Sequence, residues 1–131
     1  MEKIIIVRIR KNFENNANDE LRWFGRSLGL FNLRDKNSSC FRIFITLLKK
    51  AKRNETLSSD EIAEQLHLTR GTVVHHLHTL MNTGLIVHQP DGYILREQNL
   101  ERMIDGLKHD LEATLADLRT VAKELDEQLS L

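Results

Sequence analysis

The stretch "HLTRGTVVHHLHTLMNTGLI", residues 67–86, decides the fold. Thr69 can cap a helix there by accepting a backbone N–H, and Gly84 can end it because glycine adopts the left-handed conformation at little cost. We therefore predict a helix over residues 70–83. It carries three histidines within four positions, namely His75, His76 and His78. They raise the question of whether this helix binds a metal, takes part in catalysis or contacts a partner.

The residues before this stretch predict two more helices. In "LSSDEIAEQL", Ser58 and Glu61 have the spacing of a capping box, which marks a helix start. Further upstream, Ser38 or Ser39 can cap a longer helix. Its apolar stripe at steps of three and four consists of Phe41, Phe44, Ile45, Leu48 and Ala51. A longer helix followed by two short helices joined by a tight turn is the tri-helical helix-turn-helix pattern.

A hairpin is predicted directly after the histidine-bearing helix. Residues 85–89 and 93–96 are strand-like, and Pro90-Asp91-Gly92 between them is a turn sequence, because proline fixes φ and glycine accepts positive φ. A helix-turn-helix followed by a hairpin is a winged helix. We therefore expect a mainly α fold with a small β-hairpin wing.

Residues 97–131 predict one long amphipathic helix of about 50 Å at 1.5 Å per residue. Its apolar positions recur at a near-heptad spacing, and one four-residue step relaxes the supercoil. These positions are Leu100, Ile104, Leu107, Leu111, Leu115, Leu118, Ala122, Leu125 and Leu129. Because a two-fold dimer is the commonest way to bury such a seam, we expect a homodimer through this helix.

The chain has no net charge, but the charge is unevenly distributed. Residues 1–54 contain 13 Lys and Arg against five Asp and Glu, whereas residues 97–131 contain four against nine. The N-terminal half therefore offers a basic surface. No apolar run is long enough for a bilayer or a signal peptide, so we expect a cytoplasmic protein without membrane contact. The single cysteine, Cys40, rules out an internal disulfide, and we expect it to be a buried apolar residue.

Three segments follow from these patterns. Residues 38–96 form the predicted winged helix-turn-helix domain, and residues 97–131 form the predicted dimerisation helix. Residues 1–37 form an N-terminal extension to which the sequence assigns no role. Within it we expect a strand over residues 3–10, a loop, and a short helix followed by an irregular segment.

The sequence "LTRGTVVHHLHTLMNTGLIVHQPDGYIL" resembles the winged-helix regulators of bacteria and archaea, especially the ArsR-like group and the neighbouring MarR-like group. The family pattern reads "S-x-x-T-V-S-x-H-L-x-x-L-x-x-x-G-L-V". The matching positions are Thr69, Thr72, Val73, His76, Leu77, Leu80, Gly84, Leu85 and Ile86, whereas Val74 departs from the usual serine. The resemblance covers about residues 38–96 and implies a winged helix that binds DNA, without identifying an effector.

A helical wheel centred on Leu77 separates a buried face from a polar face. In a winged helix the polar face enters the major groove, where side chains near the helix N-terminus reach base edges. His75 and then His78 are the first candidates for base contacts, while the resemblance makes His76 a partly buried scaffold residue. The other expected DNA contacts on this helix are Thr69, Arg70, Gly71, Thr72 and Thr79. Phosphate contacts are expected from the basic cluster Lys49, Lys50, Lys52 and Arg53, or from the N-terminal Arg8, Arg10 and Lys11.

Metal sensing and catalysis both lack a suitable residue pattern. Metal sensors among ArsR-like regulators use paired thiolates or an Asp/His set along the C-terminal helix. One cysteine cannot supply a pair, and Asp105, His109 and Glu112 have no second histidine further along. No nucleophile, phosphate-binding loop or carboxylate pair has a catalytic spacing. We therefore expect no enzyme activity, metal or cofactor.

Two functions remain open from the sequence. The first is a homodimeric, sequence-specific regulator that binds double-stranded DNA. The second is a winged helix used for protein contacts in a transcription or chromatin complex, with the long helix bound to another chain. Zero net charge and the acidic hairpin tip at Asp91 favour the second, whereas the helix N-terminus and the basic "KKAKR" run favour DNA.

Overall fold

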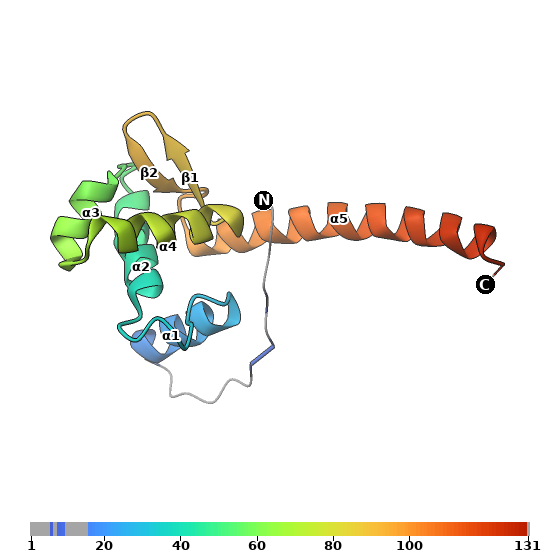
Figure 1. The fold of residues 1–131 in the computed structure, drawn as a ribbon, viewed down its shortest axis with the longest axis horizontal. Coiled ribbons are helices and arrows are strands. Elements are labelled where there is room, and N and C mark those ends of the chain that lie inside the picture. The colour runs from blue at the N-terminus through green and yellow to red at the C-terminus, as the bar shows by residue number, and fades with distance from the viewer. Residues whose placement is uncertain (1–5, 7, 10–15, 131) are drawn as a thin grey trace.

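The computed structural model describes residues 6, 8, 9 and 16–130. Three helices and an antiparallel hairpin form a winged helix, from which one long helix extends well beyond the rest of the chain (Figure 1). The predicted mainly α fold with a small hairpin is therefore confirmed. The elements are α1 (Ala17–Ser27), α2 (Ser39–Ala51), α3 (Ser59–Leu66), α4 (Arg70–Asn82), β1 (Ile86–Gln89), β2 (Gly92–Leu95) and α5 (Leu100–Gln128). The strand expected over residues 3–10 lies for the most part outside the described residues.

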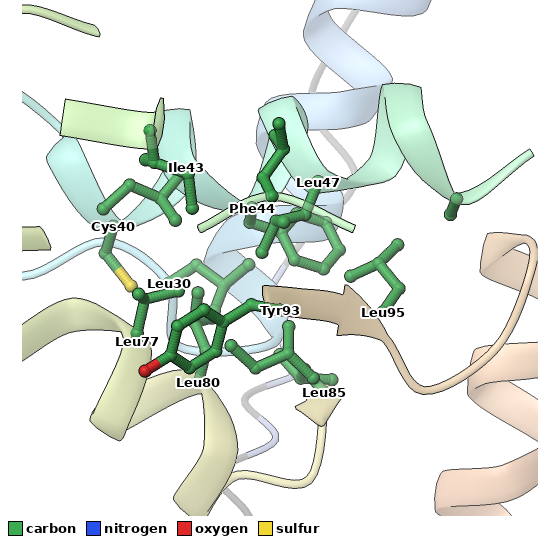
Figure 2. Close-up of a cluster of buried hydrophobic side chains, with 14 of the residues drawn as sticks. Leu30, Cys40, Ile43, Phe44, Leu47, Leu77, Leu80, Leu85, Tyr93 and Leu95 are labelled. Atoms are coloured by element: carbon green, nitrogen blue, oxygen red, sulfur yellow. The ribbon is translucent and has the colours of Figure 1, made fainter. Parts of the chain in front are cut away.

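The core lies where α2, α3, α4 and the hairpin meet (Figure 2). Ile43, Phe44, Ile62, Val73, Leu77 and Leu80 are completely buried in it. Residues from three different helices lose all contact with water, so each helix is held in one rotational setting. Cys40 is also buried in the core, as expected, and burial raises the pKa of its thiol to about 12. No helix among the described residues is long and apolar enough to cross a bilayer.

Helix α2 differs from the prediction in its cap and in its register. Ser38 has a left-handed backbone (φ 53°) and makes no side-chain cap, so the predicted serine cap is wrong. The carboxylate of Asp35 caps the helix instead, accepting from the backbone N–H of Ser39 at 2.8 Å and of Cys40 at 2.9 Å. The buried face is centred one residue earlier than predicted, on Cys40, Ile43, Phe44, Leu47 and Ala51.

Helices α3 and α4 begin as the sequence predicts. Ser58 and Glu61 form the capping box of α3. The side chain of Thr69 caps α4 by accepting from the backbone N–H of Thr72 at 3.2 Å. Gly84 follows the end of α4 with φ 78°, which confirms its left-handed conformation.

The hairpin pairs Ile86 with Leu95 and Gln89 with Gly92 at its two ends. Strand β2 also pairs with the loop before α3, where Leu57 and Tyr93 exchange two backbone hydrogen bonds of 2.7 and 3.0 Å. Glycine is required at position 92, because a Cβ there would lie 2.7 Å from the carbonyl group of Leu57. The φ of Gly92 is 151°, which other residues rarely adopt. The wing is therefore attached to the helical core through its second strand.

The N-terminal extension is partly packed onto this core. Leu28 and Leu30, which follow α1, are buried core residues. Phe31 packs against Phe41 of α2 with ring centroids 4.6 Å apart and the ring planes tilted by 31°. A Cβ on Gly25 of α1 would lie 2.7 Å from the Phe41 ring, so α1 approaches α2 closely. The described part of the extension is thus held in place by the same core as the winged helix.

Helix α5 has two parts with different surroundings. Met103 and Leu107 are buried in the core, and Leu100 packs against it. Beyond Leu111 every described residue of α5 is exposed. The exposed apolar residues include Leu115 at 60 %, Leu118 at 59 % and Leu125 at 46 %. The leucine seam therefore begins inside the domain and continues as a bare stripe.

Candidate nucleic-acid interface

Helix α4 has one buried face and one polar face. Val73, Leu77 and Leu80 are completely buried and fix the helix against α2 and α3. The opposite face is polar, and most of its residues are exposed. Of the predicted contact residues, Thr69, Arg70, Gly71, His75, His78 and Thr79 are exposed and Thr72 is partly buried. The structure thus places all seven on or near the surface of one helix and its cap.

The first turn of α4 is capped by a side chain, and there is open space beside its glycine. The Thr69 hydroxyl, which caps the helix, also hydrogen-bonds the Thr72 hydroxyl at 2.8 Å. Arg70 pairs with Asp60 at 3.5 Å, but both side chains are about three-quarters exposed, so this pair contributes little stability. A Cβ on Gly71 would meet no atom within 4 Å. Glycine in a helix costs up to about 1 kcal/mol relative to alanine, and no packing against the described residues requires it here.

The three histidines have different surroundings. His75 and His78 are exposed, whereas the His76 side chain is 13 % exposed and its Nε2 lies 3.9 Å from Oδ2 of Asp35. Burial lowers the pKa of His76, and the nearby His75 lowers it further. The negative charge of Asp35 raises this pKa but does not outweigh the other two causes. His76 therefore joins α4 to the segment that precedes α2. Among the described residues no three His, Cys, Asp or Glu side chains lie close enough together to hold a metal ion.

Asp35 is a site residue that sequence reasoning missed. Burial raises its pKa, but the two backbone N–H bonds that it accepts and the nearby His76 outweigh this, so the net pKa lies below the usual value. Its carboxylate is therefore charged at neutral pH, and its hydrogen-bond donors are backbone N–H groups of the same chain. An aspartate two residues before "NSS" was the available signal, because a carboxylate close to a helix N-terminus can accept hydrogen bonds from the free backbone N–H groups of the first turn.

A groove of about 820 Å³ runs between the polar face of α4 and residues 29–37. The α4 side is formed by Gly71, Thr72, His75, His76 and Thr79. The far wall includes Arg34 and Lys36, which are both exposed. Four of the predicted contact residues, Gly71, Thr72, His75 and Thr79, thus line one side of a hollow whose other side comes from the N-terminal extension.

The predicted phosphate contacts Lys49, Lys50, Lys52 and Arg53 lie elsewhere. Lys49 and Lys50 lie in the last turn of α2, and Lys52 and Arg53 follow its end. At 1.5 Å per residue they are about 15–20 Å along the helix axis from the Asp35 cap, and none of them lines the groove. Lys50 pairs with Glu55 at 3.3 Å. Of the alternative basic residues, Arg10 and Lys11 lie outside the described residues.

The hairpin carries no free basic side chain at its base. Arg96 follows β2 and points toward α5, where its Nη1 donates to Asp110 at 2.7 Å and to the carbonyl of Gly84 at 3.3 Å. The hydrogen bond from Arg96 to Asp110 is the main cause of the lowered pKa of Asp110. A Cβ on Gly106 would lie 3.0 Å from the Arg96 guanidinium, so the glycine makes room for it. Arg96 thus ties the wing and the end of α4 to α5.

Residues 51–90 match the IclR helix-turn-helix domain. The matched region contains α3, α4 and β1, including the whole polar face of α4. No curated protein and no solved structure matches the chain. The match supports a helix-turn-helix transcriptional regulator that binds DNA, but it does not support the ArsR-like or MarR-like group specifically.

Proposed function

We propose that the chain is a homodimeric transcriptional regulator that reads a specific double-stranded DNA sequence with α4 in the major groove. The observation that carries this proposal is the division of α4 into two faces within a region that matches a DNA-binding domain. Val73, Leu77 and Leu80 are completely buried, whereas the facing residues are polar and exposed. A helix about 10–12 Å in diameter fits a major groove about 12 Å wide.

Each part of the α4 surface has a proposed role. Thr69, Arg70, Gly71 and Thr72 lie at the helix N-terminus, where backbone N–H groups and the helix dipole favour phosphate. The absence of a side chain at Gly71 leaves room for close approach. Further along, His75, His78 and Thr79 reach base edges, and imidazole and hydroxyl groups can both hydrogen-bond to them. His76 supports the helix from the side.

The homodimer is proposed from the bare stripe on α5. The large exposed residues of the stripe beyond the core are Leu115, Leu118, Leu125 and Leu129. Contiguous apolar surface of this kind marks an interaction site on a protein. A second copy presents the same stripe, and a two-fold axis buries both at once. Two α4 helices then contact two half-sites about one DNA turn apart.

Binding of the full chain to fluorescent duplexes tests the DNA proposal. A duplex selected from a random library should bind more tightly than an unselected duplex at the same salt concentration. Affinity for both should fall steeply between 50 and 200 mM salt, because phosphate contacts release counterions. No binding to any duplex at 50 mM salt would favour the protein-interaction alternative.

The basic cluster at the end of α2 has its own test. Replacing Lys49, Lys50, Lys52 and Arg53 by Gln should weaken binding to all duplexes by the same factor and flatten the salt dependence, because phosphate contacts carry no base information. An unchanged salt dependence would show that these four side chains do not contact DNA.

Sedimentation of stripe variants tests the homodimer. The variant Leu115→Gln/Leu118→Gln/Leu125→Gln should be a monomer that unfolds at the wild-type temperature, because these side chains are exposed within one chain. A matched control places three Gln residues on the opposite side of the helix. Its substitutions are Ala113→Gln, Ala116→Gln and Thr120→Gln. A stripe variant that still sediments as a dimer would refute the proposed interface.

A further inference from the structure

The N-terminal extension forms the far wall of the groove beside α4. We propose that residues 29–37 are a second DNA-contacting element, which holds the sugar–phosphate backbone of one strand against α4 through Arg34 and Lys36. This inference rests on the proposed function, because it requires α4 to lie in the major groove.

The dimensions of DNA place a backbone in this groove. A helix with its side chains nearly fills the width of the major groove, so the two phosphate backbones run directly along its flanks. The groove lies along α4 beside Gly71, Thr72, His75, His76 and Thr79, over two turns of the helix. Its α4 side therefore includes the proposed base contacts His75 and Thr79, whereas the opposite wall, residues 29–37, faces the backbone of one strand.

The charges of the wall suit phosphate. Arg34 and Lys36 are exposed, and within the described part of the chain neither forms an ion pair. Asp35 lies between them in sequence, but its side chain is 8 % exposed and its carboxylate faces inward onto Ser39 and Cys40. Asp35 also lines the groove, but its carboxylate is engaged by the N–H groups of these two residues and lies 3.9 Å from Nε2 of His76, so Arg34 and Lys36 are the exposed charges of the wall.

The wall is also held in place before any DNA arrives. Leu28 and Leu30 anchor one end in the core, and the Asp35 cap fixes the other end to α2. Phe31 is packed against Phe41 between these points. A backbone that is ordered in advance loses less conformational entropy on binding, so only the side chains of Arg34 and Lys36 have to be ordered when they meet phosphate.

The hairpin offers little positive charge for contacts with phosphate. The wing and α1 lie on opposite sides of the α2–α4 layer (Figure 1). The wing tip carries Asp91, and Arg96 is engaged with Asp110. Positive charge along the α4 flank therefore comes from the extension and not from the wing.

A small anion is the competing occupant of the groove, and the observations favour DNA. Sites for small molecules are mostly apolar and enclose their ligand. Here the cations lie on exposed side chains, and the α4 wall is the same polar face that we propose contacts bases. The groove therefore continues the DNA-contacting surface.

The variant Arg34→Gln/Lys36→Gln tests the proposal in the full chain. We expect its affinity for selected and unselected duplexes to fall by the same factor. The slope of log affinity against log salt should flatten by about two per bound protomer, since each phosphate contact contributes about 0.9. The conservative variant Arg34→Lys/Lys36→Arg should keep the wild-type slope. The control Arg119→Gln/Lys123→Gln removes the same charges from the exposed part of α5 and should leave affinity and slope unchanged.

The possible failures can be told apart. If the wild type binds no duplex, the proposed function fails and this inference fails with it. If the wild type binds and Arg34→Gln/Lys36→Gln binds with the same affinity and slope, only this inference is overturned. If inorganic phosphate, at constant ionic strength, displaces DNA from the wild type while the variant's DNA binding is normal and insensitive to phosphate, the groove is a small-anion site. Unchanged thermal unfolding of the variant is expected, because both side chains are exposed.

Discussion

Substituting the two neighbouring histidines of α4 one at a time should separate DNA reading from folding. His75→Ala removes an exposed ring, so the stability of the fold should change by no more than about 0.5 kcal/mol. Loss of one base contact should cost about 1–3 kcal/mol of binding to the preferred sequence, which is about 5- to 150-fold in affinity. Discrimination should relax at one base position in each half-site.

His76→Ala should have the opposite effect. That ring is 13 % exposed and lies 3.9 Å from Asp35, so its removal leaves a gap between α4 and the segment before α2. Truncating a mostly buried ring costs about 1–3 kcal/mol in folding free energy, or about 4 °C in melting temperature for each kcal/mol in a chain of this size. Binding to all duplexes should weaken by a similar factor without a change in base preference.

Two measurements distinguish these outcomes. Thermal unfolding followed by circular dichroism reports stability, and a panel of duplexes with single base changes reports discrimination at each position. The reasoning is refuted if His75→Ala leaves the whole panel unchanged, or if His76→Ala melts at the wild-type temperature. If zinc alters wild-type binding but not that of His75→Ala, the histidines form a metal site.

Two further predictions concern acid stability and the two parts of α5. Because burial lowers the pKa of His76 in the folded chain, the unfolded chain binds more protons, and stability should fall as pH drops below about 6.5. The lowered pKa values of Asp35 and Asp110 should add further loss below about pH 4, and urea titrations from pH 8 to 3 would show both stages. Leu107→Ala, at a position only 2 % exposed, should destabilise the fold by about 2–5 kcal/mol. Leu118→Ala, at 59 % exposure, should instead weaken self-association in sedimentation without lowering the stability of one chain.

The local signals were enough to predict most of the winged helix. Ser58, Thr69 and Gly84 have the predicted capping roles because each acts on a backbone group within three residues of itself. The turn at Pro90-Asp91-Gly92 likewise depends only on residues that are adjacent in the sequence. Predictions of this kind depend on sequence spacing alone, so they do not require knowledge of the rest of the fold.

The prediction is wrong or incomplete where several groups compete for one backbone site or one apolar face. The sequence predicts a serine cap for α2, but the turn before the helix brings the carboxylate of Asp35 onto the N–H groups of Ser39 and Cys40. The buried face of α2 lies one residue earlier than predicted, because α3, α4 and strand β2 all pack against that helix. The sequence predicts the seam of α5 as one surface, although Leu107 belongs to the core and Leu118 does not. The sequence shows which residues are apolar but not which neighbour covers them.

The division of α5 links the proposed dimer to the proposed DNA surface. Arg96 holds Asp110 of α5 and the carbonyl of Gly84 at the end of α4, with the guanidinium fitted against Gly106. The first turns of α5 are also fixed by the burial of Leu107. In a dimer formed through the bare stripe, the direction in which α5 leaves the domain would therefore set the separation of the two α4 helices. The DNA half-site spacing would then follow from contacts within one chain, while the stripe itself would only hold the two copies together.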